Sequence, residues 1–254
     1  MTVQTTYGET PAVAFAGMLA EDFSVRQVDS FLADGAVPVG YAVKRGSTAT
    51  EAAVLTAASD VVVGIALAAS YIENASGALT YADNTSLPVI SKGRVWVTVG
   101  ETVAINDSVF AGMPTAQVST LVFSADLVTS NVCTVTINGN TVLAYTFAST
   151  HDASMTAIAA EIALDSRVAT AVAAVRTITI TGNDAGDAFT VAAVVTDGGS
   201  QATAVHTVTN SATAQTGKFY NDAASTTRAP VKGKFRTVGA ADGSLAMIEL
   251  WETN

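Results

Sequence analysis

Polar and apolar residues alternate without interruption over residues 94–99, RVWVTV, in the most regular pattern of the chain. Side chains of a β-strand point alternately to its two faces, so the three valines of this run would share one face. Gly100-Glu101 then provides a turn signal, and residues 102–110 form a second run with several apolar members. The pattern predicts a β-hairpin over residues 94–110.

Short apolar runs separated by glycine and proline flank this segment. Residues 36–44 and 61–67 have the length of single strands, and residues 245–251 form another after an Asp-Gly turn. Residues 49–58 contain helix-favouring residues, but the run is too short for a stable helix, and we expect a loop or a single turn there. Short strands at this spacing are typical of a β-sandwich or barrel.

The pattern of short apolar runs separated by glycine and proline changes after about residue 118. Residues 131–137 and 141–147 alternate on either side of Asn138-Gly139, which is the strongest hairpin signal in the sequence. Asn-Gly suits a tight turn in which both central residues adopt positive φ angles. This part of the chain is therefore predicted to begin with its own hairpin.

A helix and further strands follow this hairpin. Apolar residues repeat at helical spacing at Met155, Ile158, Ala159 and Ile162. Ser149 or Asp152 would cap the start of the helix. Residues 177–181 and 189–196 predict a second hairpin around a glycine-containing turn, and residues 202–209 a final strand. The order predicts a small ββαββ unit.

The pattern of short apolar runs separated by glycine and proline resumes after residue 215. A pattern that stops and resumes is typical of a domain inserted in a surface loop, because loop ends lie close together and tolerate insertion. We predict a mainly β fold, with a β-sandwich or jelly-roll-like outer body formed by residues 1–118 and 216–254. Residues 119–215 form the inserted α+β domain, and residues 1–24 form an N-terminal arm.

Composition excludes several function classes. The formal net charge is −10 and the chain has 12 Lys and Arg residues, whereas binding to nucleic-acid phosphates needs clustered basic residues. No apolar run reaches the roughly 18 residues of a membrane span, and the N-terminus lacks the basic residue and apolar stretch of a signal peptide. We expect synthesis in the cytoplasm and neither a nucleic-acid nor a membrane partner.

The distribution of charge differs between the two predicted parts. Arg167 and Arg176 are the only basic residues of the insert, which also has seven acidic residues, and the other ten basic residues lie in the outer body. One interpretation is that the outer body and the insert face different surroundings. The other is that these charged residues simply lie on solvent-exposed faces, which explains the same distribution.

Candidate metal and thiol chemistry is sparse. Cys133 is the single cysteine and lies in a predicted strand, so we expect a buried structural thiol. His151 and His206 have no Cys or His at metal-ligand spacing and are interpreted as solvated or packed side chains. Three aspartates surround the second predicted hairpin, at positions that fit no known calcium loop: Asp184, Asp187 and Asp197. No metal or cofactor is predicted.

Catalytic patterns are also missing from the sequence. The chain has no GxSxG elbow, P-loop or GxGxxG pattern. Glu21 and Asp22 are adjacent, and adjacent residues of a strand point to opposite faces, which argues against a shared carboxylate site. We therefore predict that the protein is not an enzyme.

Four segments follow one another in a fixed order: GAVPVGYAVKRG (35–46), DVVVGIAL (60–67), SKGRVWVTVGETVAINDSVF (91–110) and VKGKFRTVGAADGSLAMIEL (231–250). Together they resemble the structural cement proteins of tailed-bacteriophage heads. The resemblance covers about residues 12–118 and 215–254. The family's usual Gly-Asp before its exit strand is Asn106-Asp107 here, and the predicted insert lies outside the shared pattern. The insert itself is similar to small ββαβ modules of phage virion proteins.

The resemblance implies a structural role without catalysis. Members of the family are β-sandwich proteins that sit as symmetric dimers or trimers on the outer capsid surface, where major capsid protein subunits meet. We therefore expect a virion protein made in the host cytoplasm, with the major capsid protein as its partner. A homotrimer is favoured over a dimer, because three-fold junctions are common attachment points on icosahedral shells. Attachment to several subunits at once would strengthen weak individual contacts.

The segment of residues 12–23 is a candidate for contact with the capsid. Its large apolar residues are Phe15, Met18, Leu19 and Phe23. They suit an arm that lies on a neighbouring subunit by strand addition or apolar packing. An ordinary first strand of the outer body accounts for the same residues equally well, so both interpretations stay open.

The insert is interpreted as a scaffold or interface element, in preference to a receptor-binding one, because its few aromatic residues lie at core-like positions. Contact with the host surface stays an alternative. So does a host-binding adhesin or fibre module, which would have no affinity for capsid shells. An enzyme with an unfamiliar site would instead show a deep pocket with shifted pKa values.

Overall fold

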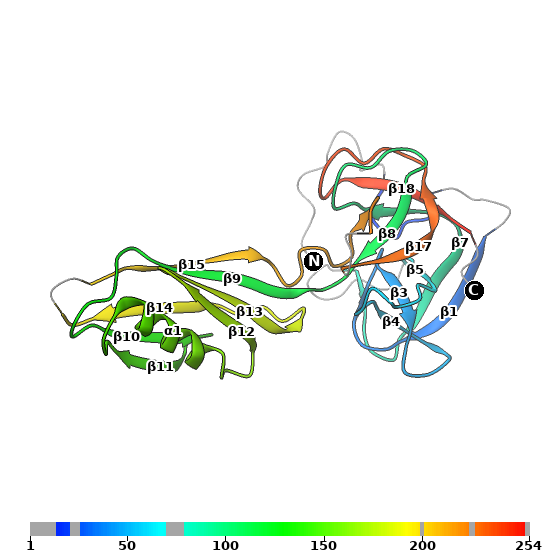
Figure 1. Ribbon diagram of the computed structural model, residues 1–254. Coiled ribbons are helices and arrows are strands. Elements are labelled where there is room, and N and C mark those ends of the chain that lie inside the picture. Colours follow the sequence, from blue (N-terminus) through cyan, green and yellow to red (C-terminus); the bar gives the residue numbers. More distant parts are fainter. Residues whose placement is uncertain (1–13, 21–25, 70–78, 199–200, 224–226, 252–254) are drawn as a thin grey trace, which may run out of the picture. The chain divides into compact units, whose positions relative to one another are not determined.

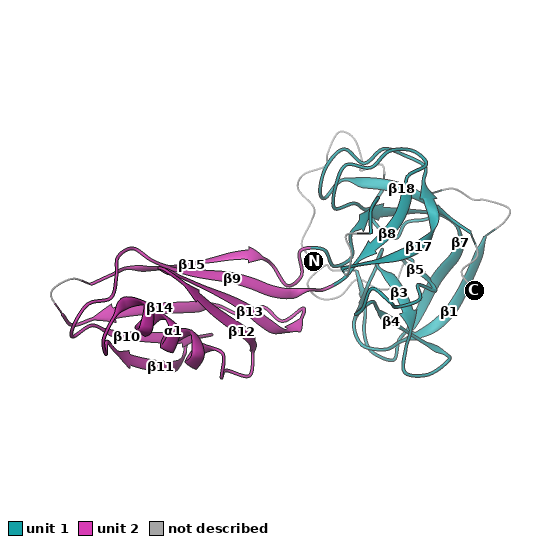
Figure 2. Cartoon of the chain, viewed as in Figure 1, with its two compact units in different colours: residues 1–113, 215–254 teal, residues 114–214 magenta. Residues whose placement is uncertain are grey.

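The computed structural model describes residues 14–20, 26–69, 79–198, 201–223 and 227–251. The chain divides into two compact units, which Figure 2 distinguishes by colour. Unit 1 comprises residues 1–113 and 215–254, and unit 2 comprises residues 114–214. Strands dominate both units, which confirms the predicted mainly β fold. The finer description of unit 1 as a sandwich or jelly roll stays a prediction.

Nine of the described strands of unit 1 pair in two circuits that share one long strand, and two further short strands pair with each other (Figure 1). Its strands are β1 (Gln27–Ala33), β2 (Val37–Pro38), β3 (Ala42–Arg45), β4 (Glu51–Val54), β5 (Gly64–Ala66), β6 (Thr80–Tyr81), β7 (Ser86–Thr98), β8 (Ser108–Gly112), β16 (Phe219–Tyr220), β17 (Arg228–Phe235) and β18 (Leu245–Leu250). The first half of β7 pairs with β1 on one side and β5 on the other, and β3 and β4 complete the first circuit.

The second half of β7 pairs with β18, and the sheet continues through β17, β8 and β16. A parallel bridge between Val99 and Phe219 links β16 back to the end of β7. β7 changes partners at Gly93, which pairs with Leu250 and has a φ of +127° that side-chain-bearing residues rarely adopt. Closing strands into circuits removes most of the exposed edges of a sheet.

The alternation of residues 94–99 has the predicted burial. Val95, Val97 and Val99 are fully buried in the core of unit 1, and the polar positions between them are half-buried. The predicted hairpin over 94–110 is nevertheless wrong. β7 pairs here with β18, and β8 pairs with β17 and β16. The connecting chain bonds instead to a distant segment, since Val103 and Gly239 exchange two backbone hydrogen bonds of 2.9 and 3.2 Å.

Residues 49–58 also differ from the prediction. They contain β4 in place of a loop or single turn. β4 pairs with β3 and, in parallel, with the end of β1. Ala52 of β4 is fully buried in the core of the first circuit, so tertiary packing overrides the helical propensity of this run.

Unit 2 has two sheets and one helix among its described residues. Its elements are β9 (Ala116–Phe123), β10 (Val132–Ile137), β11 (Asn140–Thr146), α1 (His151–Ile162), β12 (Val168–Ala174), β13 (Thr177–Ala185), β14 (Val191–Thr196) and β15 (Ala204–Asn210). The four-stranded sheet has the order β12-β13-β9-β15, and the three-stranded sheet β11-β10-β14. Within the described ranges, no helix has the length and hydropathy needed to cross a membrane.

The predicted helix and first hairpin of unit 2 are confirmed. β10 and β11 pair around Asn138 and Gly139, whose φ angles of +49° and +79° are those a tight hairpin turn requires. The helical apolar face is buried as predicted. The N-cap is Thr150, not Ser149 or Asp152, because the Thr150 hydroxyl oxygen accepts a hydrogen bond of 3.2 Å from the Ala153 N–H.

The second predicted hairpin is wrong. β13 pairs with β12 and β9, whereas β14 pairs with β10 in the other sheet. The predicted ββαββ order also lacks β9 and β12. The final strand is present as β15, which pairs with β9.

Candidate partner-binding surfaces

The proposed N-terminal contact segment lies partly along β7 of its own unit. The Gly17 N–H donates to the Trp96 carbonyl at 2.7 Å, and the Trp96 N–H donates to the Met18 carbonyl at 2.9 Å. Leu19 forms an antiparallel bridge with Val95 and packs against the unit 1 core. This stretch therefore fills the edge of β7 opposite β18.

The four candidate contact residues are thus placed differently. Phe15 is 43% exposed, Met18 is half-buried and Leu19 packs inward. Phe23 lies outside the described residues, as do Glu21 and Asp22. Phe15 offers the most apolar surface of the three described residues to a partner.

Two glycines explain the Pro-x-Gly step at residues 38–40. Gly17 and Gly40 both have a φ of +82° and approach each other closely. A Cβ on Gly40 would lie 2.7 Å from the Ala16 Cβ, and one on Gly17 would lie 2.2 Å from Val39 Cγ1. The Gly40 N–H also donates to the Ala66 carbonyl of β5 at 2.8 Å. The contact between Gly17 and Gly40 therefore joins residues 14–20 to the first circuit.

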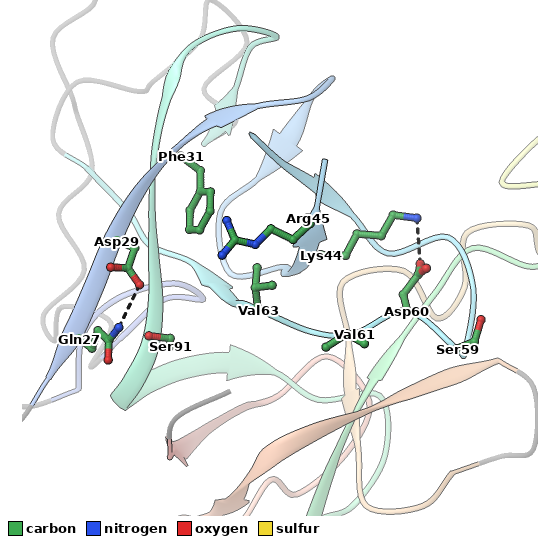
Figure 3. A pocket seen from close by; sticks show the side chains of 10 residues that line it. All are labelled: Gln27, Asp29, Phe31, Lys44, Arg45, Ser59, Asp60, Val61, Val63 and Ser91. Atoms are coloured by element: carbon green, nitrogen blue, oxygen red, sulfur yellow. Dashed lines mark hydrogen bonds and ion pairs between the residues drawn. The ribbon is translucent and has the colours of Figure 1, made fainter. Parts of the chain in front are cut away.

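A cavity of about 430 Å³ opens in the first circuit of unit 1 (Figure 3). β1 contributes Gln27, Asp29 and Phe31, which alternate along one face of the strand. The remaining lining residues are Lys44, Arg45, Ser59, Asp60, Val61, Val63 and Ser91. Mouths of β-barrels are common ligand sites, because strands that diverge there leave space between their inward-facing side chains.

Two basic residues of this cavity are held in different ways. The Lys44 ammonium pairs with the Asp60 carboxylate at 3.0 Å. Burial raises the pKa of Asp60, but hydrogen bonds from the Thr56 and Ala57 N–H groups and from Lys44 outweigh it and hold that pKa below its usual value. The Arg45 guanidinium instead lies over the Phe31 ring, 5.0 Å from its centroid. Figure 3 shows it directed toward that ring.

Ser91 adds a polar group to the wall of the cavity. The residue is 6% exposed, and its hydroxyl has no hydrogen-bond partner in the part of the chain that the structure describes. Among the described residues, Asp29 accepts only a long bond of 3.3 Å from the Gln27 amide. A second hollow of about 380 Å³ shares Ser59, Asp60 and Val61 with this cavity and is completed by Ala58, Val62, Pro230 and Lys232. The surface around Arg45 therefore offers both polar and apolar contacts.

The other charged groups of unit 1 tie strands together. Glu249 of β18 accepts from the Arg94 Nε at 3.2 Å and from the Arg236 Nε at 2.6 Å. Burial raises the pKa of Glu249, and the two guanidinium groups outweigh it and lower that pKa. Arg228 lies 3.5 Å from the Tyr220 ring centroid and pairs with Glu101 at 3.4 Å. These pairs link β7, β17 and β18 and have the geometry of structural ion pairs.

Unit 2 presents an uncharged sheet face. In the four-stranded sheet, Leu121 and Phe123 of β9 point into the core, while Thr120 and Val122 lie on the opposite face. The strand register extends this face across all four strands through Thr170, Val172, Ala174, Thr177, Thr179, Thr181, Val118, Thr120, Val122, Val205 and Thr207. All are uncharged, and Val205 is 59% exposed.

The remaining candidates have structural environments. Cys133 is buried, which raises the pKa of its thiol to about 11, so the predicted buried thiol is confirmed. His151 is packed at the start of α1: its Nδ1 accepts from the Leu127 N–H and its Nε2 lies 2.9 Å from the Val175 carbonyl oxygen. His206 lies in β15, and partial burial lowers its pKa.

Asp184 and Asp187 line a small hollow of about 140 Å³ that also contains Arg167. Asp197 lies apart from them, after β14, where its carbonyl accepts from the Asn131 amide. In the part of the chain that the structure describes, no three His, Cys, Asp or Glu side chains are grouped to hold a metal ion.

Comparison with known families decides what these surfaces belong to. Residues 3–165, more than half of the chain, match the family described as structural cement protein (E217 gp24/Pam3 gp6). The chain belongs to the structural cement protein family. The match extends into unit 2, so the expectation that the whole insert lies outside the family pattern is wrong.

A solved structure is also similar to this cement protein. It is titled "The capsid of Myoviridae Phage XM1", is 12% identical, and aligns over 100% of both chains with a TM-score of 0.44. No curated protein matches the chain. Family membership makes this a capsid-associated structural protein of the virion, from a family that is in general non-catalytic.

Proposed function

We propose that this cement protein binds the outer surface of a tailed-phage capsid and bridges neighbouring major capsid protein subunits, without catalysing a reaction. The family match carries this proposal. Bridging needs surfaces that fit several neighbours, and it needs no reactive group. Because each attached site holds the others close to the shell, several weak contacts give firm attachment.

The proposal extends to the assembly state. We expect a homo-oligomer, a trimer in preference to a dimer, that forms after synthesis in the host cytoplasm. A trimer matches the three-fold junctions of an icosahedral shell and presents each binding surface three times. The low content of charged residues, 13% of the chain, suits a protein whose surface packs against neighbours.

The two parts of the chain would divide this work. The outer body, residues 1–118 and 216–254, would carry the capsid contacts, with Phe15 and Met18 as described members of the N-terminal contact. The insert, residues 119–215, would extend the interface between copies. Its uncharged threonine and valine face supports this role, because a face without charge meets a second copy of itself without like-charge repulsion.

The absence of catalysis is supported by the character of the polar groups in unit 1. Asp60, Glu249 and Arg228 are engaged in ion pairs. The pKa values of Asp60 and Glu249 are lowered, so both carboxyl groups stay ionised at neutral pH and neither is poised as a general acid. The cavity residues suit binding of a partner group by charge and hydrogen bonds.

Light scattering and co-sedimentation test the proposal together. The purified protein is sized in solution and then mixed with shells assembled from the matching major capsid protein. We expect a defined oligomer that pellets with the shells in fixed stoichiometry. A monomer that stays in the supernatant would contradict the proposal and favour an adhesin, which binds host surfaces and ignores shells.

A further inference from the structure

The first half of β1 has an open edge beside the cavity of unit 1. β1 pairs with β7 from Gln27 to Leu32, but its pairing with β4 begins only at Leu32. Between Val28 and Phe31, the described strands therefore provide a partner on one side only. An unpaired strand edge presents backbone donors and acceptors to an incoming chain.

The hydrogen bonds at the end of β1 show which groups face this edge. The Leu32 N–H donates to the Thr50 carbonyl on the β4 side, whereas the Ala33 N–H donates to the Thr85 carbonyl on the β7 side. Backbone groups alternate in direction along a strand, and the register is regular from Val28 onward. The N–H groups of Val28 and Ser30 therefore point to the open edge, as the Leu32 N–H does.

The side chains beside this edge favour a carboxylate. Arg45 contacts the Phe31 ring and the Ala49 carbonyl, and among the described residues it has no carboxylate partner. A guanidinium held over an aromatic ring retains donors for a bidentate carboxylate. Ser91, a residue only 6% exposed, lines the same cavity, and its hydroxyl has no hydrogen-bond partner among the described residues.

We propose that this edge and cavity form a docking site for an extended acidic segment of the major capsid protein. The segment adds to β1 as a strand, pairing with the backbone of Val28 and Ser30, and places a carboxylate against Arg45. Strand addition takes affinity from the backbone and specificity from side-chain pockets. Asp29 on the same wall disfavours a second carboxylate next to it. This inference rests on the proposed attachment to capsid shells.

Three substitutions test the site with shells of the major capsid protein as the probe. Ser30→Pro removes the N–H that faces the open edge and leaves the β7 ladder intact, a position where edge strands tolerate proline. Arg45→Gln removes the charge and keeps most of the length. We expect Ser30→Pro and Arg45→Gln each to weaken shell binding about tenfold or more, since each removes part of a desolvated contact. Asp29→Asn should strengthen binding by a few-fold.

Lys234→Gln is the matched control, because it removes one positive charge from β17 of the same unit at a residue that lines neither hollow. It should bind as the wild-type protein does. Thermal unfolding of each variant shows that the fold is kept. If Ser30→Pro does not fold, amide exchange of the wild-type protein replaces it: the Val28 and Ser30 amides should exchange at least about tenfold more slowly on shells.

The outcomes separate the two proposals. Failure of the wild-type protein to pellet with shells contradicts the proposed function. Wild-type binding that is unchanged in folded Ser30→Pro and Arg45→Gln overturns the docking site alone. A loss of self-association with undiminished shell binding also overturns it, because the occupant of the edge would then be a second copy of this chain. Equal losses in Arg45→Gln and Lys234→Gln would show only a general charge effect and overturn the assigned role of Arg45.

Discussion

The two units use their strands in opposite ways. In unit 1, β7 joins two circuits, so that most strand edges are occupied and the open stretch of β1 stands out. In unit 2, the sheets are open, and the four-stranded sheet presents a broad uncharged face. Ten of the 12 basic residues lie in unit 1 and two in unit 2. The difference is consistent with our proposals that unit 1 recognises a partner at a local charged site and that unit 2 uses a flat, uncharged surface.

The largest effect is expected at the glycine contact that holds residues 14–20 against the first circuit. Gly40→Ala should lower the free energy of unfolding of unit 1 by about 3 kcal/mol or more, because it combines a strained positive φ with overpacking. Gly35→Ala is the matched control, since Gly35 has the same φ of +82° and nothing within 4 Å of an added Cβ. It should cost only about 1 kcal/mol. Equal losses in denaturant unfolding would contradict the close-approach account.

Removal of unit 2 tests whether the units work separately. The ends of unit 2 lie together, since the Thr115 N–H donates to the Ala212 carbonyl at 2.9 Å, and β8 and β16 pair on the unit 1 side. Unit 1 with a short linker between residues 113 and 215 should therefore fold. It should keep the shell binding of a single subunit and lose part of the self-association, measured by pelleting and light scattering. Shell binding by unit 2 alone would reverse the assignment.

The ion pairs of unit 1 predict a response to acid. Glu249 has a lowered folded-state pKa, so the stability it contributes is present above its unfolded value of 4.5 and is lost as pH falls through the folded value. Glu249→Gln should cost about 1–2 kcal/mol at pH 7, because two partly buried guanidinium groups lose a charged acceptor. The cost should shrink as the pH falls below 4.5 and vanish below the lowered folded-state pKa of Glu249. A pH-independent difference between the two unfolding curves would contradict this account.

The smallest effect on stability is expected on the uncharged face of unit 2. Thr120→Lys should change the free energy of unfolding by less than about 1 kcal/mol, because the side chain lies on the solvent side of β9. It should nevertheless reduce self-association, since lysines from two copies would meet. Thr156→Lys, at an exposed position of α1, is the control. Unchanged oligomer mass with Thr120→Lys would remove this face from the interface between copies.

The local patterns of the sequence were reliable where the physics is local. Asn138-Gly139 predicted its hairpin because the turn itself needs two positive φ angles. The apolar spacing of α1 predicted its buried face. The N-cap, Thr150, lies between the two predicted candidates, because Ser149, Thr150 and Asp152 are all good capping residues and only the geometry separates them.

Strand partners were less predictable than strand faces. The alternation around Val95 and Val97 predicts which side is buried, but β18 lies about 150 residues further along the chain, and no local signal marks it as the partner. The predicted pairing of β13 with β14 is wrong for the same reason: the two strands are consecutive in the chain but belong to different sheets. The cavity was missed because Phe31 and Arg45 meet only through the closure of the first circuit.

Heating of capsid shells with and without the protein tests the central claim most directly. Shells of the major capsid protein are saturated with the wild-type chain, and the temperature at which they rupture is recorded. A cement protein that bridges subunits must raise this temperature, because it binds the intact shell more tightly than it binds separated subunits. Bound protein that leaves the rupture temperature unchanged would contradict the account.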